Sequence, residues 1–171
     1  MASGLARLVV GANPKRTLVR SLVLVVLGWL LISYGILSVR GSGPSMSPTI
    51  GDGQLMVVDR VSYKVRRPRR GEIAAVTWEG EGRAVLIKRI LAGPGDTIGI
   101  ADGLVDVNGV LIDEPYVQQR ARWQMAPTLL GADEYFVVGD NRGMPMAQHT
   151  LGRVPRTRLI GPVVWIGGAP R

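Results

Sequence analysis

The sequence has 171 residues, which fits one domain with a short appendage. It has no cysteine, which excludes disulfides, a cysteine nucleophile and a thiolate metal site. It has one histidine, which makes a metal site built from histidines implausible. The net charge is +8, and residues 1–40 carry five basic residues and no acidic one. With a single Phe and no aromatic-basic stripe, this uneven charge is weak evidence for nucleic acid, and we expect no nucleic-acid partner.

Residues 21–39 form the first predicted element, an apolar run without a charge. As a helix it would be roughly 28 Å long, close to the thickness of a bilayer core. More basic residues precede the run than follow it directly, so we expect residues 1–20 to stay cytoplasmic and residues 41–171 to lie outside the cytoplasm. The alternative is a cleaved signal peptide. Because the run is longer than the usual apolar region of about 7–15 residues, we favour a single-pass anchor in the cell membrane.

After residue 41 the pattern changes to short apolar stretches separated by Gly, Pro, Asn and Asp. Strands are predicted at residues 55–58, 73–78, 84–91, 97–100, 104–107, 110–112, 135–138 and 159–165. Asn108-Gly109 is typical of a two-residue hairpin turn. Residues 116–134 have weak patterning and are expected to form a long connection. The sequence therefore predicts a mainly β ectodomain, a coiled and barrel-like sheet behind one N-terminal transmembrane helix.

A stiffly framed serine follows the apolar run. Pro44 and Pro48 restrict the backbone on either side of Ser45, and Gly43 adds freedom just before it. Such a frame can fix a hydroxyl and its own N–H at a set angle, as a nucleophile with an oxyanion donor requires. An ordinary Ser/Pro linker leaving a membrane explains the local sequence equally well.

A serine nucleophile needs a base, and two residues are candidates. His149 with Asp140 is the usual choice, although a lone histidine is more often a surface or packing residue. Lys88 lies in the apolar stretch AVLIKRIL, where its ammonium would lose water. Because an ordinary lysine is neutral in only about one molecule in 2,500 at pH 7, the role of base requires a lowered pKa. A strand lysine that reaches solvent is the commoner case.

Five motifs in the correct order resemble those of bacterial type I signal peptidases, and the likeness extends over nearly the whole chain. They are Pro44-Ser45-Met46-Ser47-Pro48-Thr49-Ile50, Arg70-Gly71-Glu72-Ile73, Ile87-Lys88-Arg89-Ile90 with Gly93-Pro94-Gly95-Asp96, Val107-Asn108-Gly109 with Glu114-Pro115-Tyr116, and Gly139-Asp140-Asn141-Arg142. Each motif alone is weak. Five in order behind an anchor of suitable orientation are specific together.

The resemblance implies a membrane-bound serine protease that removes signal peptides from exported preproteins after small residues, typically Ala-x-Ala. It implies Ser45 as nucleophile, Lys88 as general base and no metal or cofactor. It also assigns Met46 and Pro44 to substrate binding. Supporting roles fall to Gly43, Asp140, Asn141 and Arg142. Preproteins and the lipid bilayer are the implied partners.

The chain departs from the family pattern at four positions. Many members have Ser at Gly43, where its hydroxyl adds an oxyanion donor. The last motif of the family usually continues with Ser, Asp and Arg, at positions occupied here by Pro145, Ala147 and His149. That Ser would help to hold the lysine, and His149 is a candidate to replace the Arg as a brace. Two alternatives stay open: a specialised peptidase for one pilin- or conjugation-type precursor, and an inactive anchored domain that binds exported chains.

Overall fold

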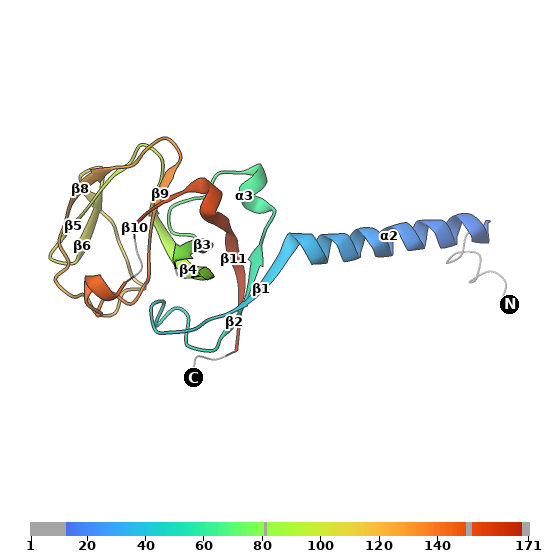
Figure 1. Cartoon of the computed structure of the whole chain (residues 1–171), viewed down its shortest axis with the longest axis horizontal. Helices are drawn as coiled ribbons and strands as arrows, with labels where there is room; N and C mark the ends of the chain where they lie inside the picture. The colour runs from blue at the N-terminus through green and yellow to red at the C-terminus, as the bar shows by residue number, and fades with distance from the viewer. Residues whose placement is uncertain (1–12, 81, 150–151, 169–171) are drawn as a thin grey trace. The chain divides into compact units, whose positions relative to one another are not determined.

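The structure is a computed structural model that describes residues 13–80, 82–149 and 152–168. Its contacts divide the chain into two units, Met1–Ile36 and Leu37–Arg171. The first unit contains helix α2 (Pro14–Gly35), which begins after Asn13, whose side-chain oxygen accepts a hydrogen bond from the Arg16 amide (Figure 1). Among the described residues, Lys15–Gly35 is the one helical stretch long and apolar enough to cross a membrane, judged by length and composition.

The bounds of this helix differ from the prediction of residues 21–39. The helix begins earlier, at Pro14, because its first turns are polar and were not counted in the uncharged run. It ends at Gly35, and the following Ile36–Arg40 form strand β1. Glycine is a poor helix former, and the β-branched Ile36 and Val39 favour an extended backbone.

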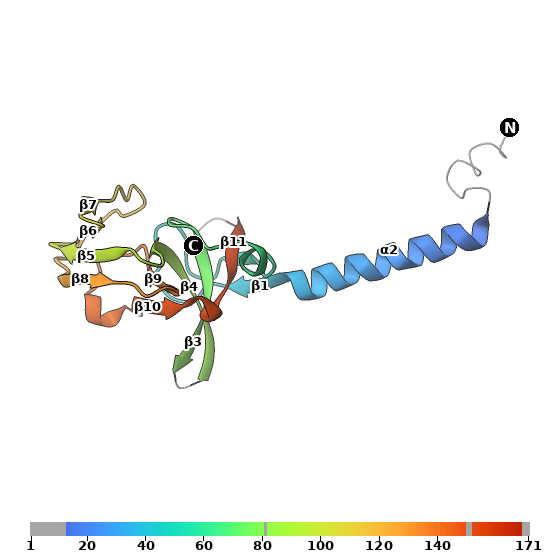
Figure 2. The same ribbon diagram turned by 90° about the horizontal axis from the view of Figure 1, so that it is seen from above.

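The second unit holds two sheets (Figures 1 and 2). The larger has the order β1-β2-β11-β3-β4-β9-β10, and its pairs from β2 to β10 are antiparallel. Its strands after β1 are β2 (Leu55–Asp59), β3 (Ile73–Gly80), β4 (Gly82–Ala92), β9 (Glu134–Val138), β10 (Gly152–Pro155) and β11 (Leu159–Gly167). The smaller sheet, with the order β7-β6-β5-β8, consists of β5 (Thr97–Ala101), β6 (Leu104–Val107), β7 (Val110–Leu111) and β8 (Met125–Leu129). Short helical turns lie at α3 (Ser62–Val65), η1 (Met146–Gln148) and η2 (Arg156–Arg158).

The larger sheet is coiled by register shifts. Strand β11 pairs with β3 through its first half and with β2 through its second, and its register with β2 shifts between Val163 and Trp165. A further shift between Ile90 and Ala92 interrupts the pairing of β4 with β9. Such irregularities bend a strand and increase its twist. The predicted fold class, a mainly β domain on a coiled sheet, is confirmed.

All eight predicted strands are present, and Asn108-Gly109 forms the turn between β6 and β7 with φ of 58° and 77°. Those positive values are what a two-residue hairpin turn demands. The prediction for residues 116–134 is wrong, because they contain β8, which pairs with β5. Strand β8 lies at the edge of the smaller sheet, includes Pro127 and is largely exposed, so it shows no alternating apolar pattern.

Two apolar clusters position the elements that carry the predicted site. One lies between the sheets and joins β4 and β9 to the smaller sheet; its buried members are Leu91, Ala92, Ile98, Ile100, Val105, Val107, Trp123, Leu130, Phe136 and Val138. The other lies beneath residues 41–54, which we call the serine loop. It consists of buried Met46, Ile50 and Met56, packed against Ile87 of β4. Burial of Met46 and Ile50 therefore fixes the serine loop against the strand that contains Lys88.

Candidate active site

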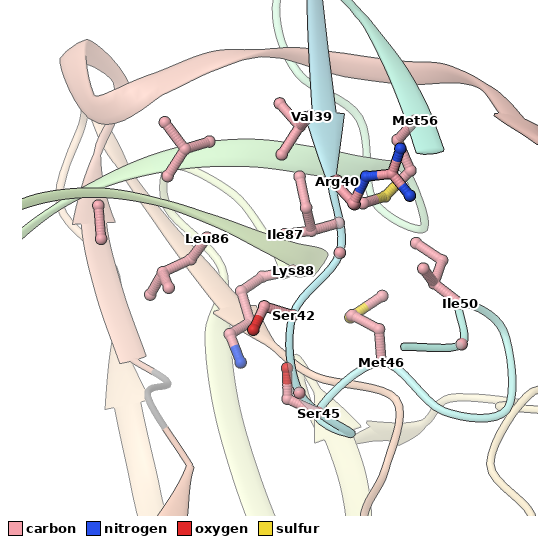
Figure 3. Close-up of a pocket in the computed structure, with 15 residues that line it drawn as sticks. Val39, Arg40, Ser42, Ser45, Met46, Ile50, Met56, Leu86, Ile87 and Lys88 are labelled. Atoms are coloured by element: carbon pink, nitrogen blue, oxygen red, sulfur yellow. The ribbon is translucent and has the colours of Figure 1, made fainter. Parts of the chain in front are cut away.

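Ser45 and Lys88 line the same pocket, whose volume is about 250 Å³ (Figure 3). The end of β1 with the serine loop forms one wall, and residues 84–88 of β4 form the other. Figure 3 shows Ser42, Ser45 and Lys88 gathered at one end of the pocket, with mostly apolar side chains and Arg40 around the remainder. The fold thus brings the two predicted catalytic residues to one cavity from separate elements.

The serine loop is fixed by hydrogen bonds of its own backbone. Gly43 has a φ of +88°, and its N–H donates to the Asp52 carboxylate at 2.9 Å. The Ser47 N–H donates to the Pro44 carbonyl at 3.0 Å. Among the described residues, neither the Ser45 hydroxyl nor the Ser45 N–H has a hydrogen-bond partner. An attacking oxygen and a backbone donor are therefore both available at Ser45.

Lys88 is only 3% exposed. Desolvation lowers the pKa of its amine, and the nearby Asp140 carboxylate opposes that shift to a smaller extent. Within the described part of the chain, Nζ makes no hydrogen bond or ion pair. Ser45 and Lys88 consequently share a pocket, but their side chains are not hydrogen-bonded to each other in this structure.

Asp140 joins the two walls of the site. Its buried carboxylate accepts hydrogen bonds from Arg89 Nε at 2.8 Å, Arg89 Nη2 at 2.6 Å and the Thr49 hydroxyl at 2.6 Å. Arg89 follows Lys88 in β4, and Thr49 belongs to the serine loop. A two-pronged pairing of arginine with carboxylate is strong and directional. Asp140 therefore sets the position of the serine loop relative to the strand that carries the candidate base.

The neighbours of Asp140 hold the backbone of Ser45 directly. The Asn141 N–H donates to the Ser45 carbonyl at 3.1 Å, and Asn141 Nδ2 donates to the Pro44 carbonyl at 3.1 Å. Gly139 lies so close to the Ser45 carbonyl that a Cβ at this position would overlap the oxygen. This explains, in physical terms, why the segment requires glycine, aspartate and asparagine in that order.

Arg142 anchors the same segment to the interior. Its guanidinium donates to the Gly139 carbonyl at 2.8 Å and to the fully buried Glu114 carboxylate at 2.6 Å. Glu114 also accepts a hydrogen bond from the Tyr116 hydroxyl, and the Tyr116 ring lies 3.8 Å from the Arg89 guanidinium carbon. Asp140, Asn141 and Arg142 thus belong to one polar network, whereas Gly43 bonds separately to Asp52.

Arg89 and Glu114 are charged members of this network to which the sequence analysis gave no role. Both lie inside motifs that it quoted, beside Lys88 and Tyr116. The available signal was Arg89 itself, a second basic residue directly after Lys88 in an apolar strand. A buried arginine requires an anionic partner.

The remaining predicted residues occupy different surroundings. Met46 is buried beneath the pocket and contributes to its lining, whereas Pro44 is exposed and does not line it. Pro145 precedes η1, Ala147 lies within it, and His149 follows it. His149 does not pair with Asp140, whose carboxylate is bound by Arg89 and Thr49. The structure therefore does not form the alternative His/Asp arrangement.

We expect Asp140→Asn to destabilise the second unit strongly. The substitution leaves the buried Arg89 guanidinium without its counter-charge, and removal of one partner of a buried ion pair typically costs about 3–5 kcal/mol. Thermal unfolding of the full chain in detergent would measure the loss. The matched control is Arg153→Gln, which removes a largely exposed pair with Glu134 and should leave Tm nearly unchanged. Equal Tm values for the two variants would contradict the role given to Asp140.

We expect Lys88→Met to raise stability at neutral pH. Because the pKa of Lys88 is lowered in the folded chain, the unfolded chain binds more protons between that pKa and the ordinary value of 10.5. The lysine therefore opposes folding at pH 7, and this penalty disappears as the pH rises toward 10.5. The gain in Tm from Lys88→Met should shrink over the same range. Lys64→Met, which replaces an exposed lysine of α3, is the control and should leave Tm nearly unchanged.

Comparison with known proteins identifies the family to which the chain belongs. A family model described as "Signal peptidase, peptidase S26" matches residues 15–167. The probable signal peptidase I-2 of Synechocystis sp. is 35% identical over 122 residues, which cover 68% of this chain and 56% of the relative. The signal peptidase I of Leptolyngbya laminosa is 34% identical over 127 residues, covering 70% and 63% respectively. That of Bacillus licheniformis is 29% identical over 151 residues, covering 82% and 81%.

The chain thus spans 56% and 63% of the lengths of the Synechocystis and Leptolyngbya relatives. Among solved structures, a signal peptidase I from Enterococcus faecalis V583 gives a TM-score of 0.45 at 21% identity, covering 58% of this chain and 99% of that one. The family model, in contrast, extends from α2 to the last residue of β11. On that match, the chain belongs to the signal peptidase family, peptidase S26.

Proposed function

We propose that this chain is a membrane-anchored serine endopeptidase that removes signal peptides from exported preproteins. In this proposal Ser45 is the nucleophile and Lys88 is the general base. The observation that carries it is the pocket shared by the two residues, in which Lys88 is buried and its pKa is lowered. Membership of the peptidase S26 family supports the class of reaction.

The proposed reaction proceeds through an acyl-enzyme. Ser45 Oγ attacks the scissile carbonyl while the neutral Lys88 amine accepts the hydroxyl proton. The free Ser45 N–H is suited to donate to the oxyanion that forms. The Lys88 ammonium then returns the proton to the leaving amine. A water molecule, deprotonated by the same amine, hydrolyses the ester and releases the signal peptide.

The pocket suits an extended peptide with small side chains. Strand β1 lies at the edge of the larger sheet, and residues 84–88 of β4 pair with β3 but, among the described strands, with no partner on their other side. Strand edges on both walls can add hydrogen bonds to an extended backbone. Met46, Ile50 and Met56 limit the depth of the cavity with apolar groups. These features favour cleavage after Ala-x-Ala.

We propose α2 as the membrane anchor of this enzyme. Lys15, Arg16 and Arg20 precede its apolar portion, which favours a cytoplasmic N-terminus. Residues 41–171 would then function outside the cytoplasm, where signal peptides leave the bilayer. In this arrangement the lipid bilayer and exported preproteins are the partners.

Cleavage of a preprotein by the purified full chain tests the proposal. With an Ala-x-Ala signal peptide in detergent or lipid, we expect a shorter mature product. Ser45→Ala and Lys88→Met should each reduce the rate more than about a thousandfold without loss of folding. Ser47→Ala is the control in the same loop, because Ser47 does not line the shared pocket.

The outcomes separate the rival functions. Cleavage that survives Lys88→Met would eliminate the proposed base. Processing of a single pilin-type precursor alone would identify a specialised peptidase. A folded wild-type chain that binds such precursors and cleaves none would identify an inactive binding domain.

The pH dependence gives a second test. Because the base acts in its neutral form, kcat/KM should rise with pH through the pKa of Lys88. Desolvation lowers that pKa, so the midpoint should lie below the ordinary value of 10.5. Steady-state rates from about pH 6 to pH 10 would locate the midpoint. A profile that starts to rise only near 10.5 would contradict a desolvated base.

A further inference from the structure

The segment around the short helix α3 carries positive charge that the protein does not neutralise. Residues 60–70 contain six basic residues and no acidic one. Two of the six are paired, Arg66 with Glu72 at 2.7 Å and Arg70 with Asp96 at 3.4 Å. Within the described part of the chain the other four form no ion pair; they are Arg60, Lys64, Arg67 and Arg69. An anionic partner is therefore the kind that this segment fits.

Two valines beside these cations are exposed. The Asp59 carboxylate fixes the start of the turn by accepting hydrogen bonds from the Val61 and Ser62 N–H groups at 2.8 and 3.1 Å. Tyr63 holds the turn from the inside, because its ring is buried in an apolar cluster. Val61 is nevertheless 40% exposed, and Val65, four residues later, is 79% exposed. Apolar side chains held in water next to cations are typical of segments that lie in the interface of a bilayer.

A cavity of about 490 Å³ lies beside α3. Arg60, Lys64 and Arg156 line it, and Asp133 supplies the one carboxylate among its described lining residues. Arg156 Nη2 donates to the Tyr63 carbonyl at 2.9 Å, which fixes this guanidinium against α3. Guanidinium and ammonium groups that share a cavity match the oxygens of a phosphate group. The cavity therefore suits the phosphate of a lipid headgroup.

The same segment lies at the end of the larger sheet where the chain enters the second unit, at Leu37. The Gly41 N–H, directly after β1, donates to the Gln54 carbonyl, directly before β2, at 2.8 Å. Because β1 and β2 are neighbours of five residues each, Leu37 and Asp59 lie together at the opposite end. Arg60 and α3 follow Asp59 directly. Leu37 comes two residues after the end of α2, so the chain allows it to lie at most about 7 Å from that helix end.

We propose that Arg60, Val61, Lys64, Val65 and Arg156, which we call the α3 patch, dock on the surface of an anionic lipid bilayer. The valines enter the interface, and the cations bind lipid phosphates. The proposal rests on the proposed function, because it takes α2 as the membrane anchor. The shared pocket lies beyond the other end of β1, a strand about 17 Å long. Docking therefore holds the pocket at one height above the bilayer.

A fluorescent label on the α3 patch tests the docking directly. The chain has no cysteine, so Val65→Cys gives the full protein a single thiol for the label. Val110→Cys is the matched control, because Val110 is a 67% exposed valine of β7 in the smaller sheet. We compare vesicles of phosphatidylcholine alone with vesicles that also contain phosphatidylglycerol, and we quench the label with acrylamide, which is uncharged.

In the anionic vesicles we expect quenching of the Val65 label to be at least about threefold weaker than in the neutral ones, because the cations attract the surface. Quenching of the Val110 label should be the same in both. Equal quenching of the Val65 label in the two kinds of vesicle would overturn the proposal.

Removal of charge tests the contact with phosphate. Each cation near an anionic surface strengthens binding about fivefold, so Arg60→Gln combined with Lys64→Gln should weaken docking roughly twentyfold and expose the Val65 label to the quencher. Arg122→Gln combined with Arg153→Gln removes the same charge from two exposed positions outside the α3 patch and should leave the label protected. An equal loss of protection in the two double variants would overturn the role given to Arg60 and Lys64.

Two further measurements separate the source of the phosphate and the proposed function. Inorganic phosphate added to the labelled chain in uncharged detergent should leave quenching of the Val65 label unchanged. The same protection there as in anionic vesicles would overturn the bilayer as the occupant. Cleavage of a preprotein is measured separately in the same vesicles. A chain that cleaves while the Val65 label stays in water overturns this inference alone, whereas a chain that docks and does not cleave contradicts the proposed function alone.

Discussion

The buried carboxylate of Asp140 is the constraint on which the site depends. It is the group that bonds both to the strand of Lys88, through Arg89, and to the serine loop, through Thr49. Without it, the apolar packing of Met46 and Ile50 would still hold the loop near β4, but hydrophobic contact is non-directional and does not fix an angle. The charged hydrogen bonds supply that direction. The packing of the second unit and the geometry of the candidate site therefore depend on the same few atoms.

This arrangement also bears on the pKa of Lys88. A carboxylate near a lysine ordinarily stabilises the ammonium, and Asp140 does act in that sense. However, its oxygens are bound by Arg89 and Thr49, and among the described residues they form no ion pair with Lys88. Desolvation is consequently the larger influence, and the pKa falls. Arg89 thus pairs with the acidic residue near Lys88, while desolvation lowers the pKa of the lysine.

Much of the fold was predictable from the sequence because strands with one buried face leave a pattern. Strand β4 and the Asn108-Gly109 turn are cases where local chemistry and tertiary structure agree. Strand β8 was missed because an exposed edge strand needs no alternation. Ser45 and Lys88 were identified through their motifs, and their common pocket follows from sheet order, which no local pattern encodes. The partners of Asp140 likewise depend on contacts across distant segments of the chain.

The departures from the family pattern acquire a physical meaning from their surroundings. Gly43 adopts a left-handed backbone that directs its N–H to Asp52, and a side chain there would add about 1–2 kcal/mol of backbone strain. The loop therefore depends on glycine, and a serine could not be added without cost. At the other departure, Pro145 has no hydroxyl, and the turn η1 that follows it leads to the buried His149. The two departures therefore differ physically: a serine at Gly43 would be strained by the left-handed backbone, whereas Pro145, with φ of −55° and ψ of 138°, has a backbone that serine adopts readily.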